Sequence, residues 1–141
     1  MKLSLMDILN ESKGKLLYSA VVLDEVSRKQ LLSFVKDFVL IPSEWKIINH
    51  HMTIGFKKPV PDELKDYIGK NIDLRVKEIG VSDDAIAVKV EGFFTYNEIP
   101  HITIVIPKNG KPSNSNLITN WMSIPNDREI IVSGVVTEIL S

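Results

Sequence analysis

Two short stretches of this chain share the same pattern of histidine and threonine. His51 is followed two residues later by Thr53, and His101, fifty positions further on, is followed in the same way by Thr103. The chain has only three histidines, so composition alone rarely produces two copies of this pattern. Both copies lie in stretches that we predict to be strands, and residues i and i+2 of a strand point to the same face. We therefore expect each histidine to project beside its threonine into one cleft.

Two histidines and two threonines in one cleft suit the cleavage of a phosphoester without a metal ion. One neutral imidazole can take a proton from water or from a ribose hydroxyl, while the other, protonated, gives a proton to the departing oxygen. The threonine hydroxyls can donate hydrogen bonds to the phosphate oxygens, on which negative charge builds. The alternative is that both histidines are simply hydrogen-bonded residues of a protein core.

The elements that must position these residues follow from the hydrophobic pattern. Apolar or alternating stretches predict strands at 16–23, 46–57, 72–81, 85–90, 101–107 and 129–140. Helical spacing predicts a helix from Glu25 to before Pro42, and short helices are expected at 61–68 and 115–121. Strands and helices mix without regular alternation, so we expect an α+β fold with a largely antiparallel sheet. The near-continuous apolar character of 101–107 predicts burial on both faces.

Length and composition predict one globular domain over residues 1–141, with residues 1–14 peripheral. Of 141 residues, 44% are hydrophobic and 25% are charged, a balance typical of soluble proteins. The absence of cysteine excludes a disulfide framework and thiol catalysis. A net charge of −1 argues against long duplex DNA but allows a small nucleotide. The N-terminal sequence is a poor signal peptide, and no apolar run reaches ~18 residues, so we expect a cytoplasmic protein without a membrane partner.

The sequences HMTI at 51–54 and HITI at 101–104 resemble the paired motif of the 2H phosphoesterase superfamily. LLYSAVVLD at 16–24 resembles the first strand of that family. The superfamily includes RNA 2′,3′-cyclic phosphodiesterases, the phosphodiesterase domain of fungal and plant tRNA ligases, and phage enzymes that destroy cyclic oligonucleotide alarm signals. The resemblance covers about residues 16–140. It implies two lobes, with mostly antiparallel sheets and outer helices, around a central cleft.

Carried over position by position, the resemblance implies that His51 and His101 are catalytic and that Thr53 and Thr103 bind the phosphate. It also implies that the first histidine protonates the leaving group and that the second acts as the base when a cyclic phosphate is hydrolysed. These two roles exchange when the reaction runs in reverse. Neither a metal nor another cofactor is implied.

Five further residues are weaker candidates for binding a substrate. Tyr18 in the first strand and Trp45, just before the first motif, are candidates for stacking on a nucleobase. Lys111 and the backbone amides from Ser113 to Ser115 are candidates for binding a phosphate at the start of a helix. The alternative for this loop is a solvated turn in which a serine or asparagine caps the helix.

The third histidine, His50, precedes the first motif and should face the opposite side of its strand from His51. We therefore expect His50 to be structural or exposed, and the two histidines should not bind one metal ion together. No metal-binding motif is present in the sequence.

Together these features predict a metal-independent phosphodiesterase that hydrolyses a nucleotide phosphodiester. The substrate is either a small cyclic or 2′,5′-linked oligonucleotide signal or an RNA 2′,3′-cyclic phosphate, and the near-neutral charge favours a short substrate. Two alternatives remain open. The cleft could bind nucleotides without turnover, or the domain could be purely structural.

Overall fold

A computed structural model describes residues 14–141 of the chain. The strands are β1 (Leu16–Leu23), β2 (Lys46–Ile47), β3 (His51–Phe56), β4 (Asn71–Val81), β5 (Ile86–Glu91), β6 (His101–Ile106), β7 (Trp121–Ser123) and β8 (Ile131–Leu140). The helices within these residues are α2 (Glu25–Phe38) and the 3-10 helices η1 (Asp62–Tyr67), η2 (Pro112–Leu117) and η3 (Asn126–Arg128). None of them is long and apolar enough to cross a membrane. Residues 1–14 are expected to be peripheral, and residues 1–13 of this segment lie outside the described residues.

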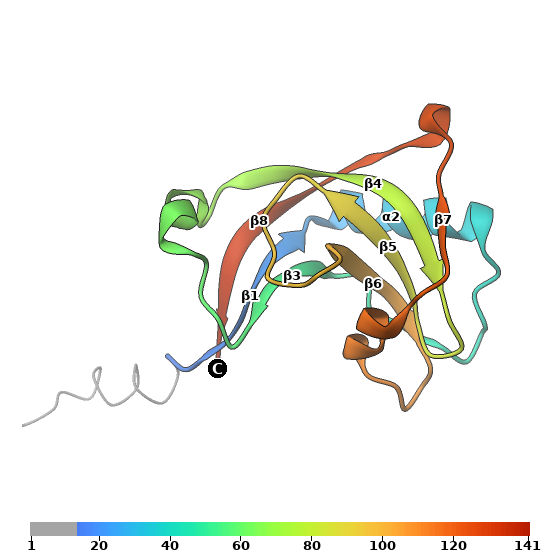
Figure 1. Ribbon diagram of the computed structural model, residues 1–141, viewed down its shortest axis with the longest axis horizontal. Coiled ribbons are helices and arrows are strands. Elements are labelled where there is room, and N and C mark those ends of the chain that lie inside the picture. The colour runs from blue at the N-terminus through green and yellow to red at the C-terminus, as the bar shows by residue number, and fades with distance from the viewer. Residues whose placement is uncertain (1–13) are drawn as a thin grey trace, which may run out of the picture.

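The strands form one antiparallel sheet that closes on itself (Figure 1). Its hydrogen-bonded order is β2-β6-β3-β1-β8-β4-β5, and β5 also pairs with β6, so the six strands from β6 to β5 make a closed ring. β2 extends the sheet beside β6, and β7 pairs with β4. The expected hairpin of residues 72–81 and 85–90 is present as β4 and β5. The predicted α+β class with a mostly antiparallel sheet is confirmed.

The two-lobed arrangement expected from the resemblance is not confirmed, because the strands form one continuous sheet. β3 and β6, which carry the two motifs, are neighbours in one continuous sheet and pair at Met52 and Ile102. Pairing β5 with β6 removes the free edges that two separate sheets would leave there. Of the outer helices expected, α2 is the one α-helix among residues 14–141, and the remaining helical segments are short 3-10 helices.

The sequence around α2 explains where this helix begins and ends. The Asp24 carboxylate accepts a hydrogen bond from the backbone N–H of Ser27 at 2.7 Å, which caps the first turn. The helix ends at Phe38, before Pro42 as expected, and Val39 is already extended. Three apolar side chains on one face of the helix are buried in the main core: Leu31, Phe34 and Val35.

The two motif strands alternate between the hydrophobic core and the opposite face. Met52 and Ile54 of β3 are fully buried in the main core, as are Ile102 and Ile104 of β6. β6 is buried along its whole length, as expected, whereas Pro107 just after it is half-buried. Because a slip of one residue would expose these core side chains, the core holds the histidines and threonines on the other face.

Two predicted elements differ from the structure for local reasons. The stretch 46–57 is two strands rather than one, because Asn49 adopts a positive φ of 41° and interrupts the extended chain. The helix expected at 115–121 instead begins at Pro112 as η2, and residues 121–123 form β7. The helix expected at 61–68 is present as the 3-10 helix η1. It stops before Gly69, whose φ is 85°.

Candidate active site

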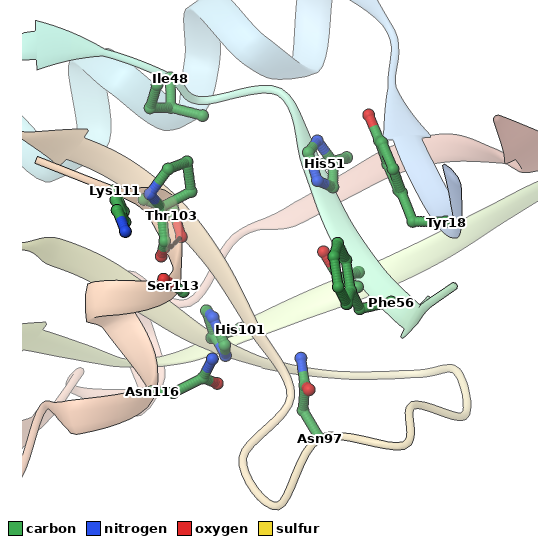
Figure 2. Close-up of a pocket in the computed structure, with 12 residues that line it drawn as sticks. Tyr18, Ile48, His51, Phe56, Asn97, His101, Thr103, Lys111, Ser113 and Asn116 are labelled. Carbon is green, nitrogen blue, oxygen red and sulfur yellow. Dashed lines mark hydrogen bonds between the residues drawn. The ribbon is translucent and has the colours of Figure 1, made fainter. Parts of the chain in front are cut away.

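A cavity of about 720 Å³ lies against β3 and β6 (Figure 2). His51 and Thr53 line it from β3, and His101 and Thr103 line it from β6. The structure therefore brings both predicted histidine–threonine pairs to one cavity. The other residues that line it are Tyr18, Ile48, Phe56, Asn97, Lys111, Pro112, Ser113 and Asn116.

His101 is held by a hydrogen bond to the backbone two residues before it. Its Nδ1 lies 2.8 Å from the carbonyl oxygen of Ile99. Since a carbonyl only accepts, the Nδ1–H of His101 donates, and in the neutral ring Nε2 carries the lone pair. Burial lowers the pKa of His101 below its usual value, and the bond to Ile99 partly offsets this by raising it. The neutral His101 ring is therefore suited to act as a base.

His51 is packed on one side by an aromatic ring and on another by a second imidazole. The Tyr18 ring stacks on it, with centroids 5.0 Å apart and planes inclined by 29°. The Nδ1 atoms of His50 and His51 lie 3.0 Å apart. Burial, together with the charges of His50 and His101, lowers the pKa of His51 from 6.5 to about 4.

The prediction that His50 faces away from His51 is wrong. His50 immediately precedes β3, and the left-handed conformation of Asn49 at φ 41° turns the chain just before it. Two hydrogen bonds to α2 hold this turn: Asn49 Nδ2 donates to the Arg28 carbonyl at 2.7 Å, and Arg28 Nε donates to the Asn49 carbonyl at 3.0 Å. Strand alternation does not apply at such a turn, so His50 lies beside its neighbour.

Ser115 has a different place from the one expected. It does not line the cavity but is buried behind Thr103, and the hydroxyl oxygens of the two residues lie 2.8 Å apart. Thr103 Oγ1 also lies 3.3 Å from the carbonyl oxygen of Pro112, to which it can donate. When the Ser115 hydroxyl donates to Thr103, the hydrogen of Thr103 is left for Pro112 or for a bound ligand. Ser115 therefore positions Thr103 rather than contacting a substrate.

The loop after β6 contributes the positively charged side of the cavity. Lys111 and Ser113 both line the cavity, as expected, and lie near Thr103 in Figure 2. Asn116 from η2 lines it as well. An ammonium group, a hydroxyl and an amide on one wall provide donors for an anionic ligand.

The two aromatic candidates have different outcomes. Tyr18 lines the cavity, but one face of its ring is already stacked on His51. Trp45 does not line the cavity, and the prediction that it stacks on a base is wrong. Its side chain is partly buried and packs against the main hydrophobic core, as aromatic residues of small domains commonly do.

Phe56 is a cavity residue that the sequence pattern did not reveal. Ala20 of β1 pairs with Thr53, whereas Ser19 pairs with Gly55, so Ile54 is an extra residue in β3. This β-bulge reverses the alternation, and Phe56 joins the face of His51 and Thr53 instead of the core face. Its side chain is 71% exposed. Gly55 was the one local signal, since glycine inside a strand often marks a bulge.

The same bulge brings Asn97 to the cavity. The carbonyl oxygen of Ile54 accepts hydrogen bonds from the Tyr96 backbone N–H at 2.8 Å and from Thr95 Oγ1 at 3.2 Å. A side chain at Gly55 would meet the Tyr96 ring, since a Cβ there would lie 2.8 Å from a ring carbon. The loop between β5 and β6 is thereby attached to β3, and Asn97 follows directly.

The comparisons with known proteins identify no relative of this chain. No protein-family model matches this sequence, and no curated protein matches it. Among residues 14–141, no group of three or more His, Asp or Glu side chains is arranged to hold a metal ion.

Proposed function

We propose that the protein is a phosphodiesterase that hydrolyses a nucleotide phosphodiester by paired histidine acid–base catalysis. The observation that carries this proposal is that both histidine–threonine pairs line one cavity, with Nδ1 of His101 bonded to the Ile99 carbonyl. This bond leaves Nε2 of His101 as a proton acceptor. The chemistry uses imidazoles and hydroxyls and needs no metal ion.

The reaction follows from these positions. His101 Nε2 takes a proton from water, and the water oxygen attacks the phosphorus. The bond from phosphorus to the leaving oxygen breaks, and that oxygen receives a proton from His51. Thr53 and Thr103 donate hydrogen bonds to the non-bridging oxygens, where charge accumulates in the transition state.

The two walls of the cavity favour a nucleotide over a simple phosphoester. Tyr18 and Phe56 give one side an apolar, aromatic character that suits the face of a nucleobase. Lys111, Ser113 and Asn116 give the other side a cation and polar groups that suit phosphate and sugar. The substrate is a small cyclic or 2′,5′-linked oligonucleotide or an RNA 2′,3′-cyclic phosphate, and the net charge of −1 favours a short one.

A nucleotide-binding module without turnover is the second candidate. It is favoured by one observation: the pKa values of both cavity histidines are lowered, so neither ring readily holds the proton that a leaving group needs. One observation counts against this candidate. A protein that only binds nucleotides gains nothing from the hydrogen bond that holds His101 in one tautomer.

A substrate screen distinguishes the two candidates. The purified protein is incubated with cyclic mono-, di- and trinucleotides, 2′,5′-oligoadenylates and RNA ending in a 2′,3′-cyclic phosphate, and the products are identified by mass. We expect one class to be hydrolysed, and we expect His51→Ala and His101→Ala to lose this turnover while still binding the ligand. Binding without product in the wild-type protein would favour the module.

A further inference from the structure

We propose that His50 is a positioning residue that fixes the tautomer of His51 and passes it the proton lost to the leaving oxygen. The proposal stands first on geometry: the two Nδ1 atoms lie 3.0 Å apart, and the rings meet edge to face, with centroids 5.2 Å apart and planes at 82°. The hydrogen bond between the two rings does not depend on the proposed function. The transfer of a proton to a leaving oxygen does depend on it.

A hydrogen bond between two ring nitrogens needs one hydrogen between them. If His50 donates it, Nδ1 of His51 is the acceptor, and a neutral His51 carries its own hydrogen on Nε2. Since Nδ1 faces His50, which does not line the cavity, Nε2 is the nitrogen left for a ligand. His51 then presents a donor to the cavity, while His101 presents an acceptor. The two rings thereby take opposite roles.

The proton transfer balances without any further reactant. As the bond from phosphorus to the leaving oxygen breaks, the Nε2 hydrogen of His51 moves to that oxygen. The Nδ1 hydrogen of a protonated His50 moves to Nδ1 of His51, which stays neutral. His50 ends as a neutral ring and can regain a proton from solvent, because its side chain is only half-buried.

The difference in burial between the two rings favours a proton of the pair on His50 over His51. The stronger burial of His51, together with the charges of His50 and of His101 on β6, holds the pKa of His51 at about 4. The pKa of His50 is also lowered, by burial and by Arg28 on α2, but its ring is less buried. Tyr18 on β1 stacks on His51. Of the two rings, the less buried His50 is therefore the one from which a proton can pass to His51.

Nitrogen NMR on the free protein tests the tautomer without requiring any activity. The chain has three histidines, so His50→Ala, His51→Ala and His101→Ala assign every ring in a long-range proton–nitrogen spectrum. Near neutral pH we expect His51 to be neutral with its hydrogen on Nε2. In His50→Ala the His51 pKa should rise and its two tautomers should mix. An unchanged His51 pattern in that variant, or a wild-type hydrogen on Nδ1 of His51, would overturn the pair.

Kinetics on the identified substrate tests the passage of the proton. The amide of Asn lies close to the position of Nδ1, so His50→Asn can still donate to His51 but cannot supply a proton. We expect His50→Ala and His50→Asn both to lower kcat about a hundredfold, while His50→Asn alone keeps the His51 tautomer. Lys46→Ala, exposed on β2 outside the cavity, should match the wild type. Full kcat in His50→Asn would overturn the relay.

Discussion

Nδ1 of His101 lies 2.8 Å from the carbonyl oxygen of Ile99, and this bond determines which nitrogen of the ring can act on a ligand. The carbonyl holds the hydrogen on Nδ1, so a neutral His101 offers Nε2 as a base. His51, in contrast, is bonded to another imidazole rather than to a carbonyl. The two copies of one sequence pattern are therefore supported differently, which fits two different roles.

Replacing Ser115 should weaken both stability and catalysis. Ser115→Ala removes the hydroxyl that lies 2.8 Å from Thr103 Oγ1 at a site buried from solvent. Losing this buried hydrogen bond costs about 0.5–1.5 kcal/mol, and Thr103, which keeps only the Pro112 carbonyl as a partner, should lose the fixed position proposed for binding phosphate. Urea denaturation and steady-state kinetics measure the two effects. Ser123→Ala, at an exposed position of β7, is the control, and wild-type kcat in Ser115→Ala would contradict the role given to Ser115.

Removing the exposed aromatic ring of Phe56 should weaken substrate binding without harming the fold. Stacking of a base on an aromatic ring contributes about 1–3 kcal/mol, so Phe56→Ala should raise KM roughly ten- to a hundredfold with a smaller effect on kcat. Phe56→Tyr should retain wild-type behaviour. Phe94→Ala, which removes an exposed ring outside the cavity, serves as the control. An equal loss in both alanine variants would exclude a base-binding role for Phe56.

The buried His51 should make stability depend on pH. Its folded pKa of about 4 lies below the usual 6.5, so the unfolded chain binds the proton more readily. The contribution is fully present above about pH 6.5 and is lost as pH falls towards 4, which amounts to about 2–3 kcal/mol between pH 7.5 and 4.5. Urea denaturation at both pH values measures it. His51→Gln should lose this part of the pH dependence, and an identical dependence in both proteins would contradict the lowered pKa.

A chelator should leave the activity intact. The groups assigned to the reaction are imidazoles, hydroxyls and one ammonium, none of which needs a metal to act at neutral pH. Hydrolysis of the identified substrate is therefore measured before and after dialysis against EDTA. Loss of turnover that is restored by adding Mg²⁺, Mn²⁺ or Zn²⁺ would refute the proposed chemistry.

The sequence pattern correctly predicted features that depend only on residues close together in the chain. β1 has the predicted bounds of 16–23 because a short apolar run ends at Asp24, and the same residue caps α2. The four motif residues reach one cavity because the spacing i to i+2 holds within β3 and β6. Pairing of β3 with β6, and closure of β5 onto β6, depend on distant contacts that no local pattern encodes.

The residues that were missed or misplaced lie where the regular pattern breaks. Phe56 reaches the cavity because of the bulge at Ile54, and His50 lies beside His51 because Asn49 turns the chain at positive φ. The early start of η2 at Pro112 buries Ser115 behind Thr103 instead of exposing it. Each case reflects a bulge or turn that is stabilised by hydrogen bonds to a distant segment.

Single-turnover hydrolysis by the wild type, His51→Ala, His101→Ala and the double variant tests most directly whether two imidazoles act on one phosphorus. We predict that each single variant lowers the rate by about 10²–10⁴-fold, that the double variant loses little more, and that all four proteins bind the substrate in calorimetry. Wild-type rates in either single variant, or no product from any nucleotide class with the wild-type protein, would contradict the account.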